Sequence, residues 1–587
     1  MKTAGAGTQT IVNEQSKSIW KKPWKGPRAL LLWFALLACS VFVEVFSIGW
    51  LLSGNPSHLM DLVMLAMAMA VGIALIAMLA SVIVRWLFCW CNLRRVLFGI
   101  ACVATLLALF YAEEDWRGKH AWQSYTREWE ARGDKFDLVS LAPKPVPDDQ
   151  NFALTPLLKP ALDFTRVDGK PQWRDSNALT HLQSIGAELA PYGRPNDHLV
   201  LGKLDQGTFA DLEACRNFYR GNTNYPQPAT PGTAANDILV ALGKYDAEVK
   251  ELREAAATRP YCRFPIEYDY DMPAAILLPH LSRIKALSIL VQLRAIAELE
   301  ADRSSEAFED LKLGFRLSDS IREEPIVIDH LVRIATLGIQ LQGLREGLVR
   351  HRWSDAQLAE LEKYLAALDL FKEYKHAMRG ERAFATGILE WVLRQGVKFD
   401  ASGVFGGDDY TPPLGRSLNF MPSGGYYQNM LTIYRLHEKF TLASVDEQQH
   451  RAFPEITANE DQVLNQMRMT PYNIFSKLLF SALGGVTVKN ARMQTLVDAA
   501  RVACAAERYR LANGQLPDTL DALVPRFIEK IPNDVIDGNP LRYRKKADGS
   551  YIVYSVGWNQ TDDGGTLAWT TGKPPSINIR KGDWVWQ

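Results

Sequence analysis

Four oxygen-bearing side chains near the C-terminus have the composition and spacing of a calcium-binding loop. Asn559, Asp562 and Asp563 fall within five residues, and two glycines follow them. Asp583, close to the end of the sequence, could return to close the site. Calcium takes about six to eight oxygen ligands from carboxylates, amides and backbone carbonyls. We therefore predict that Asn559, Asp562, Asp563 and Asp583 bind one calcium ion. The alternative is a polar turn whose carboxylates all face water.

A second group of carboxylates could perform acid–base chemistry. Glu267, Asp269 and Asp271 alternate with Tyr268 and Tyr270. If this segment is extended, the three carboxylates share one face and the tyrosines share the other. Such a face could bind a cation or supply the acid and base of a hydrolase. A solvated strand with its tyrosines packed inward is the simpler interpretation.

No other motif points to a reaction. Asp408-Asp409 lies in a stretch rich in Gly, Pro and Asp, where a solvated turn is expected. The sequence contains no His-Glu-x-x-His motif, no phosphate-binding Gly-rich lysine loop and no dinucleotide-binding glycine pattern. It also has no Gly-x-Ser-x-Gly nucleophile turn. The ten histidines are scattered, so the sequence identifies no catalytic centre.

The cysteines predict at most one disulfide. Seven cysteines are too few for a disulfide scaffold in a chain of this length, and four of them lie in or beside apolar runs. Of the other three, Cys504 shares an apolar helix face with Leu496 and Ala500. In an oxidising compartment this leaves Cys215 and Cys262 as the predicted pair.

Three long apolar runs predict a membrane anchor. They extend from Leu30 to Leu52, from Leu62 to Val84 and from Val96 to Ala112. A helix needs about 20 apolar residues to cross a bilayer, and about 17 is the lower limit. The third run is short, but Phe110 and Tyr111 extend it with aromatic residues. We predict three transmembrane helices and contact with the lipid bilayer.

The charges that flank these runs predict the orientation. Basic residues precede the first run and occupy the second loop, whereas the first loop has none and acidic residues follow the third run. Because cytoplasmic loops are enriched in Lys and Arg, we place the N-terminus in the cytoplasm and the chain from about Glu113 outside a bacterial inner membrane. The basic residues are Lys17, Lys21, Lys22, Lys25 and Arg28 before the first run, and Arg85, Arg94 and Arg95 in the second loop.

Glu44 lies inside the first apolar run. An ionisable group at the bilayer centre costs about 2.5–3.5 kcal/mol on insertion scales. It could take part in a proton or ion relay, or it could face the helix bundle and bond to a neighbouring helix. Three short spans with one carboxylate favour the second interpretation.

Composition and charge restrict the remaining function classes. The 587 residues carry 66 basic and 66 acidic side chains, so the formal net charge is zero. The composition therefore gives no support for nucleic-acid binding, which is typical of basic proteins. We predict a mainly α-helical protein in five parts. These are a cytoplasmic tail (1–28), a three-helix anchor (29–112), a stalk with a Pro-rich linker (113–150), a helical extracytoplasmic domain (151–485) and a C-terminal α+β module (486–587).

Helical periodicity is strong in the middle of the chain. Apolar residues recur at helical spacing from Phe209 to Leu252, with a Pro-rich break near Pro226–Pro231, and again from Leu277 to Gly396. The joint near Arg303 is weakly similar to that of a tetratricopeptide-type helical pair. Ordinary packing of α-hairpins is the interpretation we favour. The second stretch divides into Leu278–Glu300, Ser304–Ile321, Ile326–Leu348, Asp355–Leu368 and Phe371–Gln395.

The C-terminal module resembles the soluble part of type II secretion major pseudopilins. A long helix ends at Asn513-Gly514 and is followed by Leu516-Pro517, Pro532-Asn533-Asp534, the stretch Asp537–Tyr543 and the strand residues Tyr554–Gly557. In pseudopilins the terminal loop binds calcium. The resemblance assigns that role to Asp562, Asp563 and Asp583, with backbone near Ser555. The chain lacks a prepilin cleavage site and has a distant three-helix anchor, so we do not expect it to be a pilin subunit.

Phrases along most of the soluble chain are similar to those of a family of large membrane-anchored proteins of Planctomycetes and Verrucomicrobia. This resemblance implies no particular activity. The phrases are residues 117–122, 147–152, 508–514, 554–559 and 561–565.

Together these features predict a membrane-anchored structural or interaction protein of the cell envelope. We expect an envelope protein partner, and a link to a secretion or pilus-like assembly is consistent with the C-terminal module. The alternatives are an envelope hydrolase that uses one of the acidic groups, or an ion-linked membrane protein that uses Glu44.

Overall fold

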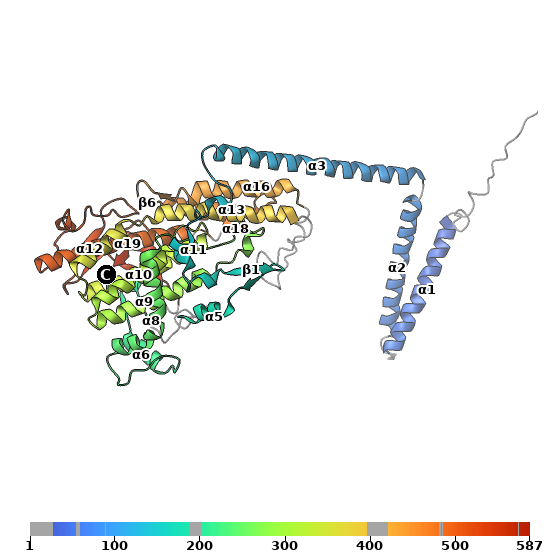
Figure 1. Cartoon of the computed structure of the whole chain (residues 1–587). Helices are drawn as coiled ribbons and strands as arrows, with labels where there is room; N and C mark the ends of the chain where they lie inside the picture. The colour runs from blue at the N-terminus through green and yellow to red at the C-terminus, as the bar shows by residue number, and fades with distance from the viewer. Residues whose placement is uncertain are drawn as a thin grey trace, which may run out of the picture. The chain divides into compact units, whose positions relative to one another are not determined.

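The computed structural model of the chain is mainly helical, with small antiparallel sheets near the C-terminus, as predicted. It divides into two compact units, residues 1–113 and 114–587 (Figure 1). The structure describes residues 27–53, 59–87, 90–186, 201–395, 421–480, 483, 485–572 and 575–587. Asp408-Asp409 and nearly all of the predicted cytoplasmic tail therefore lie outside the described residues.

The first unit is built from long apolar helices. They are α1 (Pro27–Ser53), α2 (Leu59–Leu87) and the first part of α3 (Trp90–Glu130). Each contains a segment that is long and apolar enough to cross a membrane. These segments contain most or all of each predicted run. In lipid, a continuous apolar sequence without Pro stays helical because the helix satisfies its own backbone hydrogen bonds.

Helices α1 and α2 pack against each other through small side chains. Ala66, Ala70 and Ala74 on α2 are buried, and their four-residue spacing places them in one row along the helix. Small residues let two helix backbones approach closely. We had expected Glu44 to face the helix bundle and bond to a neighbouring helix. In the structure its side chain is instead exposed on the surface of α1.

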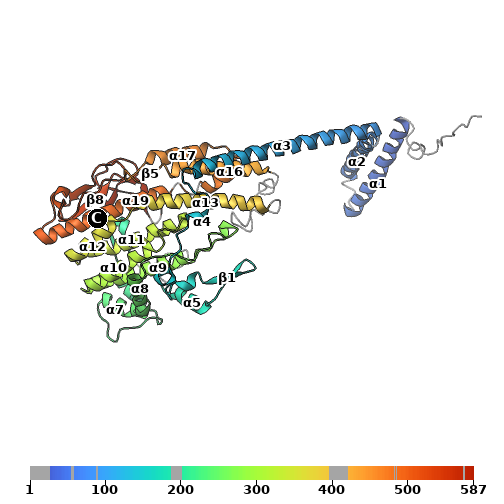
Figure 2. The same cartoon turned by 45° about the horizontal axis from the view of Figure 1, so that its top comes forward.

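Helix α3 continues well beyond the predicted third span. It runs unbroken to Glu130 and includes the charged segment that we had predicted to be a stalk. Within the second unit, this later part of α3 lies beside α16 (Ser423–Leu436) in both views (Figures 1 and 2). The predicted stalk is therefore a packed helix of the second unit, hereafter the body.

A stack of helices forms the centre of the body and agrees with the predicted segments to within a few residues. The first two form an α-hairpin, and the third packs on both. Ser354 begins the fourth helix with a capping box that it forms with Gln357. The helices are α9 (His280–Glu300), α10 (Ser304–Asp319), α11 (Val327–Val349), α12 (Asp355–Ala366) and α13 (Leu370–Gln395).

Shorter elements precede this stack. A hairpin of β1 (Phe164–Val167) and β2 (Lys170–Trp173) and another of β3 (Leu201–Lys203) and β4 (Thr208–Ala210) flank α5 (Ser176–Ser184). The predicted helical stretch with a Pro-rich break is present as α6 (Leu212–Arg220), α7 (Ala234–Leu242) and α8 (Asp246–Thr258).

The predicted Cys215–Cys262 disulfide is wrong for this structure. Cys215 and Cys262 are not joined by a disulfide. Cys215 is fully buried on α6 and Cys262 packs against the same hydrophobic cluster. The two thiols contribute apolar contacts, as buried cysteines commonly do, and elimination among three residues could not detect this.

The C-terminal part begins with the long helix α19 (Val486–Asn513), which ends at Gly514 in the left-handed conformation (φ 76°). A three-stranded antiparallel sheet follows, in the order β11 (Trp584–Trp586), β8 (Tyr551–Ser555), β7 (Arg542–Lys545). A second pair joins β9 (Leu567–Trp569) to β10 (Ile577–Gly582). Helix α19 shares one hydrophobic core with α11 and α12, so it is integrated into the body.

Helices α16, α17 (Pro454–Gln466) and α18 (Ile474–Phe480) lie between α13 and α19 in the sequence, with a short hairpin of β5 (Val445–Asp446) and β6 (Arg451–Ala452) before α17. A turn of π-helix, His437–Thr441, continues α16. Helices α16 and α18 pack with α13 around a separate aromatic cluster that also receives Trp122 from α3.

Candidate functional site

Three buried ionisable side chains meet inside the body. His280 is the first residue of α9, Glu324 lies in the turn between α10 and α11, and Asp329 is in the first turn of α11. Nε2 of His280 is 3.1 and 3.0 Å from the two carboxylate oxygens of Glu324. Ligand atoms of all three residues lie within 4.8 Å of one another. This buried His–Glu–Asp cluster could hold a metal ion.

The cluster is closed to solvent and contains polar atoms without partners. His280, Glu324 and Asp329 are 1%, 4% and 0% exposed, and the ring of Phe264 lies 4.3 Å from the imidazole. Nδ1 of His280, both carboxylate oxygens of Asp329 and the hydroxyl of Tyr268 have no hydrogen-bond partner. Such atoms are rare in folded proteins because each costs about 1–3 kcal/mol.

Burial disfavours the charged form of all three side chains of the cluster. Burial raises the pKa of Glu324 and of Asp329 well above the usual range, and the charge of Glu324 raises the pKa of Asp329 further. Burial lowers the pKa of His280 to about 4. Among the described residues, no Lys or Arg forms an ion pair with either carboxyl group. The site therefore holds two carboxyl groups with no basic side chain to balance their charge.

The extended segment before α9 forms part of the wall of this cluster. Phe264, Ile266 and Tyr268 are buried, while Pro265 and Glu267 between them are more exposed. Of the two tyrosines predicted to pack inward, Tyr268 is buried and Tyr270 is only partly buried. Burial raises the pKa of the Tyr268 hydroxyl, and the nearby charges of Glu324 and Asp329 raise it further.

The three carboxylates of the same segment do not form a shared site. The chain turns at Tyr268-Asp269, which ends the common face. Glu267 pairs with Arg166 at 2.7 Å, and Asp271 pairs with Arg394 at 2.9 Å. Each carboxylate thus has its own basic partner or faces solvent, as the solvated interpretation of this segment expects.

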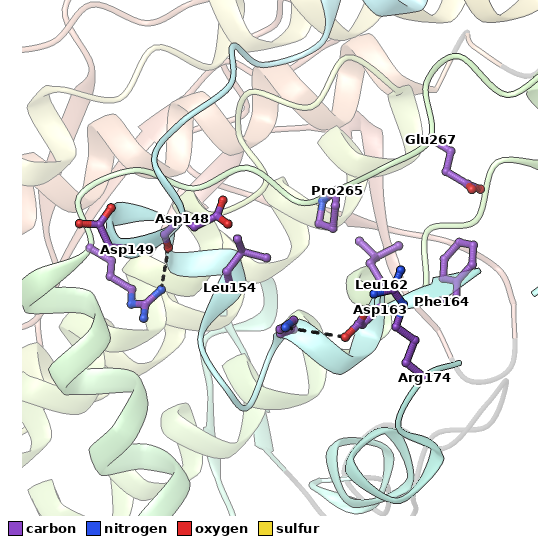
Figure 3. Close-up of a pocket in the computed structure, with 11 residues that line it drawn as sticks. Asp148, Asp149, Leu154, Leu162, Asp163, Phe164, Arg174, Pro265 and Glu267 are labelled. Carbon is purple, nitrogen blue, oxygen red and sulfur yellow. Dashed lines mark hydrogen bonds and ion pairs between the residues drawn. The ribbon is translucent and has the colours of Figure 1, made fainter. Parts of the chain in front are cut away.

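Glu267 nevertheless borders an open pocket of about 610 Å³ on the outer side of the segment (Figure 3). Asp163 in this pocket is paired with Lys159 at 3.8 Å and with Arg174 at 3.4 Å. The pocket could admit a small polar ligand to Glu267, but its charged groups already neutralise one another in part. Its lining is Asp148, Asp149, Leu154, Lys159, Leu162, Asp163, Phe164, Arg174, Arg259, Pro265 and Glu267.

The residues of the predicted calcium loop lie close together at the C-terminus. Asn559 Nδ2 donates to Asp563 Oδ2 at 3.1 Å, and the Asp563 backbone N–H donates to Asp583 Oδ1 at 3.2 Å. The other oxygen of Asp583 accepts the backbone N–H groups of Gly565 and Thr566 at 2.6 and 3.3 Å. Backbone donors therefore satisfy the buried Asp583 carboxylate.

Asp562 is turned toward a basic side chain instead. Arg542 Nε donates to Asp562 at 3.0 Å, and the same guanidinium contacts Asp534 at 3.1 Å and Asp537 at 2.6 Å. Arg542 thus supplies positive charge that a cation would otherwise provide. The carboxylates of Asp562, Asp563 and Asp583 do not share the close spacing of the buried His–Glu–Asp cluster, and calcium binding stays a prediction.

No family model, curated protein or solved structure matches this chain. The resemblances to pseudopilins and to the planctomycete and verrucomicrobial family therefore stay predictions.

The sequence pattern did not reveal the buried His–Glu–Asp cluster. His280 is far along the chain from Glu324, and Glu324 and Asp329 stand on different elements. Metal motifs are recognised by short spacings on one element, and this cluster has none. The sequence did contain one sign of a buried polar site: Asp329 and His330 are adjacent ionisable residues at the beginning of an otherwise apolar helical segment.

Proposed function

We propose that this protein is a membrane-anchored structural or interaction protein of a bacterial cell envelope, with its body outside the cytoplasmic membrane. The course of α3 is the observation that carries the proposal. Its apolar first part is long enough to cross a bilayer, and Trp122 in its later part belongs to a hydrophobic cluster of the body. One helix thus serves as membrane span and as structural element, which suits a protein that holds other components at the membrane.

The later part of α3 meets α16 through backbone contact. The side-chain-free surfaces of Gly118 and Gly424 face each other, and a Cβ built on Gly118 would lie 2.3 Å from the Gly424 carbonyl oxygen. The Gly424 N–H donates to the carboxylate of Asp115 at 2.9 Å. Two opposed glycines allow helices to approach more closely than any other pair of residues.

Aromatic packing continues this contact beyond the glycines. The ring centroid of Trp122 is 5.3 Å from that of Tyr434 and 5.7 Å from that of Phe136, both in edge-to-face geometry. Phe136 stacks on Tyr434 at 4.5 Å. Such pairs add about 0.5–1.5 kcal/mol each beyond the area they bury, so this segment is a stable part of the body.

The charge pattern supports the orientation within this proposal. Basic residues before and at the start of α1, at the end of α2 and at the start of α3 favour the cytoplasm, and acidic Glu113 to Asp115 follow the third span. Trp116, which is 67% exposed on α3 just after these acidic residues, suits the membrane interface, where amphipathic rings are favoured. The body would then occupy the periplasmic or extracytoplasmic side.

The pseudopilin resemblance makes a secretion or pilus-like assembly the favoured setting, with calcium in the C-terminal loop. We expect the full chain to bind one Ca²⁺ more tightly than about a millimolar, the weak end for extracellular modules. Asp563→Asn should weaken binding by about tenfold because it removes one negative charge from the site without touching the backbone contacts of Asp583. Calorimetry in detergent tests this. An unchanged affinity in the variant would show that Asp563 belongs to an ordinary polar turn and does not bind calcium.

An interaction role is tested by chemical crosslinking of intact membranes followed by mass spectrometry of the crosslinked peptides. We expect reproducible crosslinks from body lysines to one envelope protein or to a second copy of the chain. A chain that yields only internal crosslinks at native abundance would contradict the proposal.

An envelope hydrolase is the second candidate, since the pocket beside Glu267 brings this predicted acidic residue to a ligand-sized space. Glu267→Gln separates the two functions. A hydrolase would lose its activity while the protein stays folded and abundant, whereas the interaction role predicts unchanged crosslinks.

A further inference from the structure

We propose that the buried His–Glu–Asp cluster is a structural metal site for a zinc-type divalent cation, bound by His280, Glu324 and Asp329. This goes beyond the proposed function, because neither anchoring nor partner binding requires a metal here. The first observation is the convergence of three potential ligands from three segments of the chain, with their donor atoms within 4.8 Å of one another.

The second observation is independent of that convergence. Both carboxylate oxygens of Asp329 are fully buried and have no hydrogen-bond partner. Buried carboxylates are normally paired, hydrogen-bonded or coordinated to a metal. Asp329 lies beside Glu324 and His280, and a cation between the three side chains would coordinate its oxygens.

Charge balance points in the same direction. Two carboxylates and a neutral imidazole carry a net charge of −2, which one divalent cation cancels. Among the described residues, Glu324 has only His280 as an ion-pair partner, and Asp329 has none. Some other buried carboxylates of the body are paired with basic side chains. Asp310, for example, is bound by Arg253 at 2.5 Å and by Arg294 at 3.1 Å.

The ligand set selects the class of metal. Zinc is bound by imidazole nitrogen and carboxylate oxygen at about 2.0–2.2 Å, so two of its tetrahedral ligands lie roughly 3.3 Å apart. Nε2 of His280 is 3.0 Å from the nearer oxygen of Glu324, which is close to this spacing, and a ligand oxygen of Asp329 lies within 4.8 Å of both. Calcium prefers about six to eight oxygens, and this site offers too few. The Tyr268 hydroxyl or a water molecule could complete the coordination.

The position of the cluster defines its role. It joins the start of α9 to the turn after α10 and to the first turn of α11, so a bound ion would fasten the central helices together. Solvent does not reach the three side chains, and catalytic zinc sites need an open position for substrate or water. The inferred site is therefore structural.

The test uses the full chain, purified in detergent without a histidine tag and analysed by elemental mass spectrometry and thermal unfolding. We expect about one zinc per chain, a lower melting temperature after chelation and recovery when Zn²⁺ is added back. Mn²⁺ and Ca²⁺ serve as comparison ions, and we expect Ca²⁺ not to restore the melting temperature.

Asp329→Asn is the decisive variant because the two hypotheses predict opposite signs. If the cluster binds zinc, the variant loses at least about tenfold in zinc affinity and melts at a lower temperature. If the cluster is only a protonated carboxyl pair, removing a buried ionisable group leaves the melting temperature unchanged or raises it. Zinc that persists undiminished in Asp329→Asn, or a chain that never binds zinc, would overturn the proposal.

A matched control is available elsewhere in the body. Glu460 is 1% exposed, and neither of its carboxylate oxygens has a hydrogen-bond partner, but it is not part of a ligand group. Glu460→Gln should keep the zinc content of the unsubstituted chain. A loss of zinc in this control as well would show that the metal depends on general stability and would also overturn the assignment.

Discussion

Replacing Gly118 by alanine is expected to destabilise the body by about 1–3 kcal/mol, the range found for overpacked cores. The new methyl group would lie 2.3 Å from the carbonyl oxygen and 2.5 Å from the Cα of Gly424. Both are backbone atoms of a helix and cannot move aside as a flexible side chain would. The substitution would therefore push α3 away from α16 and open the cluster around Trp122.

Gly99 provides a control on the same helix. A Cβ built on Gly99 meets nothing within 4 Å. Alanine is favoured over glycine within a helix by about 0.5–1 kcal/mol, so Gly99→Ala should be neutral or slightly stabilising. The same chemical change in one helix is thus expected to have opposite signs at two positions, which separates helix propensity from packing.

Gly424→Ala tests the partner side of the contact, since its methyl group would lie 1.9 Å from the carbonyl oxygen of Glu114. The measurement is denaturant unfolding of the detergent-solubilised chain, followed by tryptophan fluorescence. Because the two glycines touch, the combined Gly118→Ala and Gly424→Ala change should cost less than the sum of the single changes. Additive or absent effects would show that α3 does not pack on α16 in this way.

The second large effect is expected at Arg382 of α13, where replacement by methionine should lower the free energy of unfolding by about 3–5 kcal/mol. Arg382 is fully buried. Its guanidinium binds Asp134, just after α3, and Glu438, in the π-helical turn, and it lies over the ring of Tyr434 at 4.5 Å. Methionine fills similar space but removes the basic partner of both carboxylates.

Two further variants make this expectation specific. Adding Asp134→Asn and Glu438→Gln to Arg382→Met should recover much of the lost stability, because no uncompensated charge then remains. Arg132→Met removes an exposed ion pair with Glu128 and should cost less than about 1 kcal/mol. A similar cost for Arg132→Met and Arg382→Met, measured by the same unfolding curves, would contradict the role of the buried guanidinium.

The helical architecture could be predicted because it depends on local patterns. The joints near Arg303 and Ser354 separate the central helices as expected, since helix caps and turn residues act over a few positions. The three apolar helices followed from length and hydropathy alone. The continuity of α3 through Glu113–Asp115 was missed, because a change from apolar to charged residues marks a change of solvent and not the end of a helix.

The sites could not be predicted to the same extent because they depend on tertiary contacts. The spacing of Asn559, Asp562 and Asp563 correctly suggested one polar loop. It could not show that Asp562 pairs with Arg542, because Arg542 lies on a strand elsewhere in the sequence. His280 meets Glu324 only because α9 and α10 form a hairpin. Pairings between elements far apart in sequence leave no periodic signal in a single chain.

The orientation of the protein in the membrane is the most direct test of an anchored extracytoplasmic body. A dual reporter, with alkaline phosphatase active only outside the cytoplasm and a green fluorescent protein that folds inside it, can be fused after Asn13, Arg94 and Pro147. We predict fluorescence at Asn13 and Arg94 and phosphatase activity at Pro147. Fluorescence without phosphatase activity at Pro147 would place the body in the cytoplasm and contradict the proposed function.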